Sequence, residues 1–290
     1  MAGLERSTVA DFMSEIDLTR AETHFAFGRN WASYAQSVAE AEIKEAEAGL
    51  LRLLGGEPPR GTRFLDIGSG SGLHSLAALR LGASHVHAVD IDEDSVATTR
   101  ALLSRFAHDR DWQAVHASVF ELTPEGLGEF DLVYSWGVLH HTGDLNRAVR
   151  CAARLVRPGG LFLFALYRRV WADFFWRFEK RWYAKASPAA QARARAVYTA
   201  LFRMWFRLTG RRFDDYQAGY CSNRGMEFQH DVHDWMGGWP YESVAPEEVE
   251  DLMRPLGFER VRSFVGRGRF FGRYTGIFGS GCDEFVYRRV

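Results

Sequence analysis

The pattern of hydrophobic and polar positions divides the chain into a helical start and a longer alternating part. From Gln36 to Leu54, strong helix formers carry apolar residues near helical spacing, which predicts an amphipathic helix. Gly55-Gly56 and Pro58-Pro59 end this pattern. We therefore expect residues 1–59 to form an N-terminal helical cover for the part that follows.

Short apolar runs then alternate with helical patterns. The runs predict strands over 63–67, 85–89, 112–116, 130–135 and 161–167, and the helical patterns lie at 72–81, 93–107 and 145–156. Pro158-Gly159-Gly160 predicts a turn that closes the last of these helices. Strands alternating with helices favour a parallel sheet with right-handed crossovers, so residues 60–167 are expected to form an α/β core.

The alternation breaks after residue 167 and returns near residue 243. Residues 168–212 are helical in character and hold twelve Arg or Lys residues against two acids. Residues 213–242, rich in Gly, His, Asp and Trp, predict a loop. A helix over 245–256, started by Ser243 and Pro246, and strands over 258–265 and 284–289 are expected to complete the core in residues 243–290. Residues 168–242 thus form an insertion of helix and loop.

Composition narrows the classes of function. The formal net charge is -1, so no overall field favours a nucleic-acid partner. The three cysteines, Cys151, Cys221 and Cys282, show no CxxC spacing, which argues against a disulfide framework and fits a reducing cytoplasm. The N-terminus is charged where a signal peptide is apolar, and no apolar run reaches transmembrane length. We expect a cytoplasmic protein that is not inserted in a membrane.

Three glycines alternate where the first strand meets its helix, in Gly68-Ser69-Gly70-Ser71-Gly72. Such glycines let the backbone turn tightly and let a ligand approach without Cβ clashes. The amides at the helix N-terminus favour a negative group. Dinucleotide-binding loops place their third glycine three residues after the second, but here Leu73 holds that position. The spacing is therefore GxGxG, with Asp66 two residues before it.

An acid closes the second strand. Asp90 lies 18 residues after Gly72, where a carboxylate in such folds accepts hydrogen bonds from ribose hydroxyls. Asp92 is expected to face solvent or to cap the next helix.

The glycine loop resembles motif I of the class I S-adenosylmethionine (SAM)-dependent methyltransferases. Phe130–Ser135 resembles the fourth-strand motif of this family, and Arg157–Gly160 resembles the turn before its fifth strand. The resemblance covers residues 60–167 strongly and 243–290 weakly. It implies a Rossmann-like, seven-stranded and mostly parallel sheet with helices on both faces, and SAM as the cofactor.

The resemblance also implies a set of cofactor residues. Ser118 matches a position where the family often has an acid for the adenine amine, so this contact would use the Ser118 hydroxyl or Val119. The whole set is Asp66, Gly68, Ser69, Gly70, Gly72, Asp90, Ile91, Ser118, Val119 and Trp136.

The residues that follow the fourth strand, from Trp136 onward, are expected to face the methyl group, because ligands bind at the carboxyl ends of the strands. An imidazole removes protons near neutral pH, which makes His140 the expected base and His141 its support. A structural role for either histidine is the alternative. Trp31 and Tyr34, three residues apart, are expected to present aromatic faces near the sulfonium and the substrate, with core packing as the alternative.

The basic insertion leaves three alternatives open: a cationic lid over an anionic substrate, an interface between copies of the chain in a homo-oligomer, and a membrane-surface contact. RNA binding ranks below these. His230, His233 and Trp239 are candidates for substrate contact. The HxxH spacing alone is weak evidence for a metal site, so no metal is expected.

The sequence therefore predicts SAM-dependent methyl transfer to oxygen, nitrogen or carbon of a small molecule, such as a sugar, an aromatic or a natural-product intermediate. One rival is an NAD-dependent oxidoreductase, which Leu73 disfavours. The other is a non-catalytic scaffold with a methyltransferase-like fold, which has no need of the glycines, Asp66 and Asp90 together.

Overall fold

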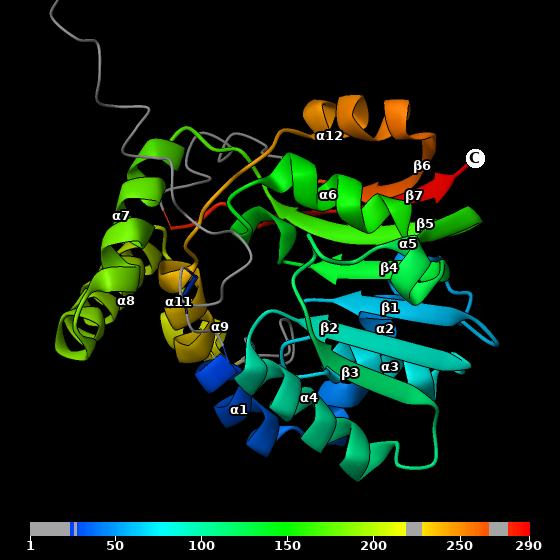
Figure 1. Cartoon of the computed structure of the whole chain (residues 1–290). Coiled ribbons are helices and arrows are strands. Elements are labelled where there is room, and N and C mark those ends of the chain that lie inside the picture. Colours follow the sequence, from blue (N-terminus) through cyan, green and yellow to red (C-terminus); the bar gives the residue numbers. More distant parts are fainter. Residues whose placement is uncertain (1–23, 26–27, 219–227, 267–277) are drawn as a thin grey trace, which may run out of the picture.

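The computed structural model describes residues 24–25, 28–218, 228–266 and 278–290 (Figure 1). Its centre is a seven-stranded sheet in the order β3-β2-β1-β4-β5-β7-β6. β1 to β5 pair in parallel, and β7 runs antiparallel to both β5 and β6. The mostly parallel Rossmann-like sheet expected from the sequence is thereby confirmed. Its strands are β1 (Arg63–Ile67), β2 (His85–Asp90), β3 (Trp112–His116), β4 (Phe130–Trp136), β5 (Val156–Tyr167), β6 (Phe258–Phe264) and β7 (Cys282–Arg289).

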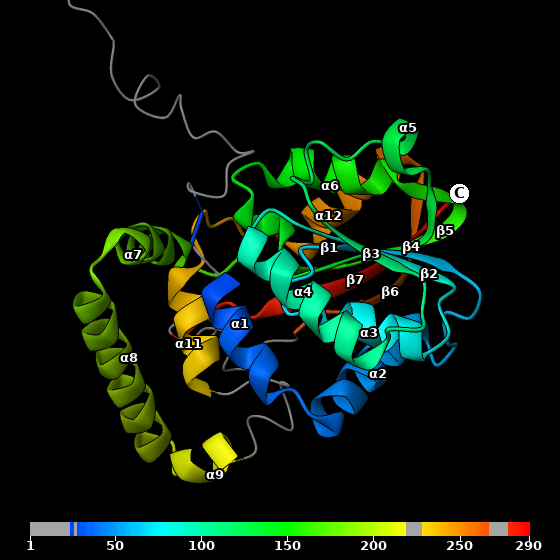
Figure 2. The same cartoon turned by 60° about the horizontal axis from the view of Figure 1, so that its bottom comes forward.

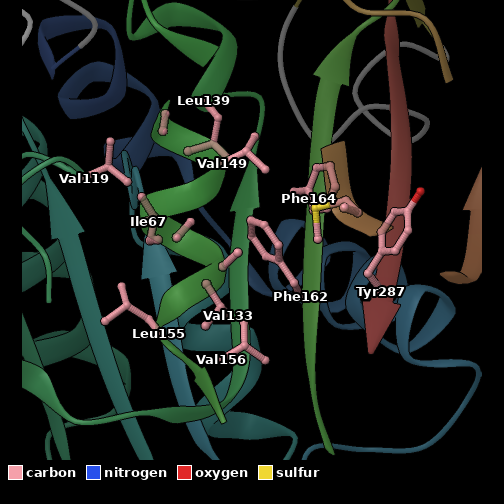
Figure 3. Packing of buried hydrophobic residues seen from close by; sticks show 14 of the residues in the cluster. Ile67, Val119, Val133, Leu139, Val149, Leu155, Val156, Phe162, Phe164 and Tyr287 are labelled. Carbon is pink, nitrogen blue, oxygen red and sulfur yellow. The ribbon is translucent and has the colours of Figure 1, made fainter. Parts of the chain in front are cut away.

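Helices cover both faces of the sheet, because successive strand residues point to opposite faces. Leu65 of β1 belongs to one hydrophobic cluster and Phe64 to the other. The first cluster contains residues of α6 (Leu145–Arg154) and α12 (Pro246–Met253). Figure 3 shows part of it, including Val149 of α6 and Phe162 of β5. The second contains α2 (Glu40–Leu54), α3 (Leu73–Arg80) and α4 (Glu93–Phe106). The short α5 (Pro124–Leu127) precedes β4.

The remaining helices gather beside the ends of the parallel strands (Figures 1 and 2). They are α1 (Gly28–Ser37), α7 (Asp173–Lys185), α8 (Pro188–Leu208), α9 (Phe213–Ala218) and α11 (Phe228–Gly237). A third cluster joins Phe25, Tyr183 of α7, Phe206 of α8 and Phe228 of α11. The insertion therefore carries a hydrophobic core of its own. Among the described residues, no helix is both long and apolar enough to cross a membrane.

The loop predicted over residues 213–242 is wrong in part, because α9 and α11 lie within it. Their aromatic residues pack on α8: Phe213 and Phe228 lie edge-on to each other at 5.2 Å, and Phe228 stacks on Phe202 at 6.1 Å. These contacts join parts of the chain far apart in sequence, which local turn-forming residues do not reveal.

Two local predictions need correction. The turn expected at Pro158-Gly159-Gly160 lies inside β5, which starts at Val156 and shifts register against β4 near Phe130. A Cβ on Gly160 would lie 2.9 Å from the carbonyl oxygen of Asp131, so the glycine lets the two strands approach closely. Helix α12 is capped by Ala245 and Glu248; Ser243 instead donates its hydroxyl hydrogen to Asp173.

Candidate active site

The glycine loop joins β1 to α3 in a conformation that requires glycine. Gly68 has φ of 78° and Gly70 has φ of 54°, both in the left-handed region. A Cβ on Gly68 would lie 2.3 Å from Val138, and one on Gly70 would lie 3.2 Å from the ring of Trp31. The loop is fixed to β2, since the backbone N–H groups of Gly68 and Ser69 donate to the carbonyl oxygen of Val89.

Two buried carboxyl groups support this loop. Asp90, at the end of β2, accepts hydrogen bonds from the backbone N–H groups of Gly70 (2.9 Å) and Asp92 (3.0 Å). Asp66, at the end of β1, accepts one from the Ser75 hydroxyl (2.6 Å). Burial raises the pKa of Asp66 to about 7 and the pKa of Asp90 to about 6, because removal from water disfavours the charged form. The Asp92 carboxylate accepts hydrogen bonds from the backbone N–H groups of Asp94 and Ser95 and thereby caps α4. Capping this helix is one of the two roles expected for Asp92.

A cavity of about 760 Å³ lies above the glycine loop, at the carboxyl ends of the parallel strands. Nine of the ten expected cofactor residues line it: Asp66, Gly68, Ser69, Gly70, Asp90, Ile91, Ser118, Val119 and Trp136. The tenth, Gly72, does not line the cavity. A Cβ on Gly72 would lie 3.0 Å from Thr99 of α4, so this residue faces that helix instead. Gly72 thus shapes the turn into α3 from outside the cavity.

Helix α1 closes one side of this cavity. Trp31 and Tyr34 both line it and pack edge to face, with ring centroids 6.1 Å apart. Tyr34 also belongs to the hydrophobic core beneath α1. It therefore both lines the cavity and packs in the core, the two alternatives expected from the sequence. The backbone N–H of Gly28 donates to Asp92, which joins α1 to the start of α4.

Comparisons with known proteins agree with this geometry. A family model described as a methyltransferase domain matches residues 65–164. The chain is 37% identical over 109 residues to a ubiquinone biosynthesis O-methyltransferase of Aromatoleum aromaticum, and 36% identical over 116 residues to one of Caulobacter sp. (strain K31). These matches span 38% and 40% of this chain but only 45% of each relative. The glycine loop, Asp90 and the β4 segment all lie inside the matched stretch. Residues 65–164 therefore match a methyltransferase domain.

Solved structures show the same fold over more of the chain. A magnesium protoporphyrin IX methyltransferase of Synechocystis PCC 6803, with bound S-adenosylhomocysteine (SAH), is 13% identical with a TM-score of 0.51, covering 86% of this chain and 84% of that one. A SAM-dependent methyltransferase of Mesorhizobium loti is 19% identical with a TM-score of 0.50, covering 84% and 98%. At these identities the similarity shows the shared fold alone.

The two histidines of the methyltransferase domain point in different directions, and His141 rather than His140 lines the cavity. His140 is fully buried and does not line the cavity. Its Nδ1 accepts the backbone N–H of Tyr167 at 3.3 Å, and burial lowers its pKa well below the usual value. His141 lines the cavity, with Nδ1 2.7 Å from the carbonyl oxygen of Pro240. Burial lowers its pKa to about 3, so its imidazole is neutral at physiological pH.

Two of the three candidates for substrate contact in the insertion, His233 and Trp239, do not line the cavity. His233 accepts a hydrogen bond from Arg195 (3.0 Å) and pairs with the Tyr183 hydroxyl (2.7 Å), so it joins α11 to α7 and α8. Trp239 packs near Arg181 and its carbonyl oxygen accepts the backbone N–H of Phe25. The side chain of His230 lies outside the described residues. Within the described residues no cluster of three or more potential metal ligands occurs.

Aromatic residues of the insertion also line the cavity, a role that the sequence did not predict. They are Tyr198, Phe202, Tyr216, Phe228 and Trp235, together with Phe278 and Tyr167 of the core. The aromatic run around Phe202 was visible in the sequence, but only the packing of α8, α9 and α11 shows that these rings share one wall.

The charges on the cavity wall contradict one of the alternatives for the insertion. None of the twelve basic residues between 168 and 212 lines the cavity, so they form no cationic lid over it. Among the described residues, Arg52 is the one Arg or Lys on the wall, and it is paired with Glu284 through two hydrogen bonds of 2.8 and 2.9 Å. Glu284 also accepts from the indole N–H of Trp136 at 3.0 Å. Asp231 and Asp234 add further acidic groups.

A buried lysine lies behind the aromatic wall. The Lys180 ammonium stands 3.6 Å from the centre of the Trp235 ring and 5.4 Å from that of Tyr241, and no described residue hydrogen-bonds to it. Burial lowers its pKa to about 7, whereas the aromatic faces favour its charged form. Lys180 therefore adds positive potential behind the wall without entering the cavity.

Proposed function

We propose that this chain transfers the methyl group of SAM to a small, largely apolar aromatic acceptor. One observation carries the proposal: the glycine loop and Asp90 line the same cavity as a group of aromatic side chains from the insertion. A cofactor end and an acceptor end in one space are what a two-substrate transfer requires.

The residues on the glycine-loop side fit SAM. Gly68 and Gly70 border the cavity with backbone alone, because a Cβ there would meet Val138 or Trp31. Asp90 presents carboxylate oxygens that accept from ribose hydroxyls. Ser118 and Val119 border the place for the adenine, and Trp31 offers an aromatic face to a cationic sulfur. When bound, SAM supplies an electrophilic methyl group on a sulfonium centre.

His141 is the proposed proton acceptor for the acceptor's hydroxyl or amine. It is the histidine that lines the cavity, and its neutral ring has one nitrogen that accepts a proton. The contact between Nδ1 and the Pro240 carbonyl places the hydrogen of the neutral ring on Nδ1 and orients the imidazole.

The acceptor class follows from the wall that surrounds it. Phe202, Phe228 and Trp235 favour a flat apolar molecule, since aromatic rings stack or meet edge to face. Acidic side chains outnumber cations on the same wall, which disfavours an anionic acceptor.

The test is transfer of a radioactive methyl group from SAM to a panel of phenols and aromatic amines, with aromatic carboxylates as the contrasting set. We expect labelled product from the neutral compounds and at least about tenfold less from the carboxylates. Tight SAH binding without any labelled product would instead favour the non-catalytic scaffold. Product from carboxylates alone would contradict the proposed acceptor class.

A further inference from the structure

Helix α7 presents large apolar side chains to the outside of the protein. Phe174, Phe178 and Trp182 follow one another at intervals of four residues, so they form a stripe along one face of the helix. Phe174 is 80% exposed, Phe178 72% and Trp182 48%. Just before the helix, Trp171 is also exposed. Aromatic rings exposed to this extent and gathered in one stripe indicate an interaction surface.

Helix α8 repeats the arrangement. Val197, Leu201, Met204 and Leu208 are exposed and recur at intervals of four, three and four residues. A second face of α8, about a third of a turn away, carries Tyr198 and Phe202, which line the cavity. One helix thus separates the cavity from this outer apolar stripe, and Figures 1 and 2 both show α7 and α8 at the edge of the molecule, away from the sheet.

The exposed charged side chains of α7 and α8 are of one sign. Arg177 and Arg181 are exposed beside the α7 stripe, and neither has an acidic partner within 4 Å among the described residues. Helix α8 contains no Asp or Glu, and Arg193, Arg203 and Arg207 are exposed on it. An interface between two copies through these faces would bring like charges together without acids to neutralise them. An anionic surface is complementary to the same pattern.

We propose that the outer faces of α7 and α8 dock on an anionic lipid bilayer. Aromatic rings on an amphipathic helix enter the boundary between headgroups and acyl chains, and flanking arginines attract anionic headgroups. The docked protein holds the aromatic cavity wall one helix thickness from the bilayer, which suits an acceptor that partitions into lipid. The docking itself does not depend on methyl transfer.

The experiment is flotation of the full chain with vesicles of phosphatidylcholine, with and without phosphatidylglycerol. We expect binding to the anionic vesicles and a loss of at least about tenfold in F174S/F178S and in R177E/R181E. The matched control is R150E/R154E on α6, which reverses two exposed arginines at the same spacing and gives the same net charge. This control should stay within about twofold of the wild type. Thermal unfolding of each variant verifies that it is folded.

Three results would overturn the proposal. One is no vesicle binding by the folded wild type. Another is an equal loss in R150E/R154E, which would show attraction by net charge alone. The third is a wild-type dimer in analytical ultracentrifugation that F174S/F178S converts to a monomer, without vesicle binding, which would assign the surface to a second copy of the chain.

Discussion

At the scale of single residues, the cofactor side of the cavity is formed by residues whose conformation and place follow from the sequence next to them. The positive φ at Gly68 and the place of Asp90 at the end of a strand are decided by a few neighbouring residues, so the sequence predicts them. The order of His140 and His141 is not decided locally. They lie in a single 3-10 turn, Leu139–His141, where neighbouring side chains point about 120° apart. Which ring accepts the backbone N–H of Tyr167 in β5, and which pairs with the Pro240 carbonyl and lines the cavity, depends on contacts distant in sequence.

Asp90→Ala should weaken SAH binding by about 1–3 kcal/mol, roughly 5- to 150-fold in Kd, through loss of hydrogen bonds to the ribose. Calorimetric titration measures this. The control is Asp144→Ala, which removes the cap of α6 away from the cavity and should lower stability while leaving Kd unchanged. An unchanged Kd in the Asp90 variant would reject the ribose assignment.

The raised pKa of Asp66 predicts a pH dependence of stability. Between the unfolded value of 3.8 and the folded value of about 7, the folded state binds more protons than the unfolded state. The contribution of Asp66 is therefore fully present below pH 3.8 and is lost as pH rises towards 7, at up to about 1.4 kcal/mol per pH unit.

Asp66→Asn should flatten this decline, because asparagine stays neutral and still accepts from Ser75. Urea unfolding at several pH values between 4 and 7 measures the slope. Asp109→Asn, at an exposed position, is the control and should follow the wild type. Equal slopes for wild type and the Asp66 variant would show that Asp66 is ionised throughout.

Substitution of each histidine separates catalysis from packing. His141→Ala should slow methyl transfer by about 10²-fold or more with little change in SAH affinity, as expected for loss of a general base. His140→Ala should act mainly on stability, because its buried ring packs 3.8 Å from the ring of Tyr167. The measurements are single-turnover rates and thermal unfolding; turnover near the wild-type value in the His141 variant would rule out its role as base.

At the scale of elements, the core strands and the helices between them could be predicted because each carries its own apolar pattern. Helices α9 and α11 could not, because their short segments are ordered by rings from α8. The same applies to the start of β5, where a Pro-Gly-Gly sequence that is typical of a turn pairs with β4 instead. In both cases a contact distant in sequence outweighs the local preference.

Phe202→Ala should weaken binding of the acceptor without affecting the cofactor. Phe202 lies on α8, and its ring stacks on Phe228 and contacts Phe278 in the aromatic wall. We expect KM for an aromatic acceptor to rise about tenfold while the SAH Kd stays within about twofold. Met204→Ala, on the outer face of α8, is the matched control in the absence of lipid. A fall in SAH affinity equal to the change in KM would show that α8 supports the whole cavity rather than the acceptor side.

At the scale of the molecule, the sheet order explains how residues distant in sequence meet. The strand order reverses between β1 and β4, and the residues that follow these strands face one another at their carboxyl ends. The fold class therefore also predicts where the site lies. The fold class does not predict which residues of the insertion border the site. His233 contacts Arg195 within the insertion and Trp239 contacts Phe25 of the N-terminal segment, so neither lines the cavity as expected.

The central claim is that the cavity above the glycine loop is a SAM site. Calorimetric titration of the full chain with SAH, beside NAD under the same conditions, tests it most directly. We predict one-to-one binding of SAH at micromolar Kd, within the usual range for such ligands, and no measurable binding of NAD. Tight binding of NAD, or no binding of SAH, would contradict it.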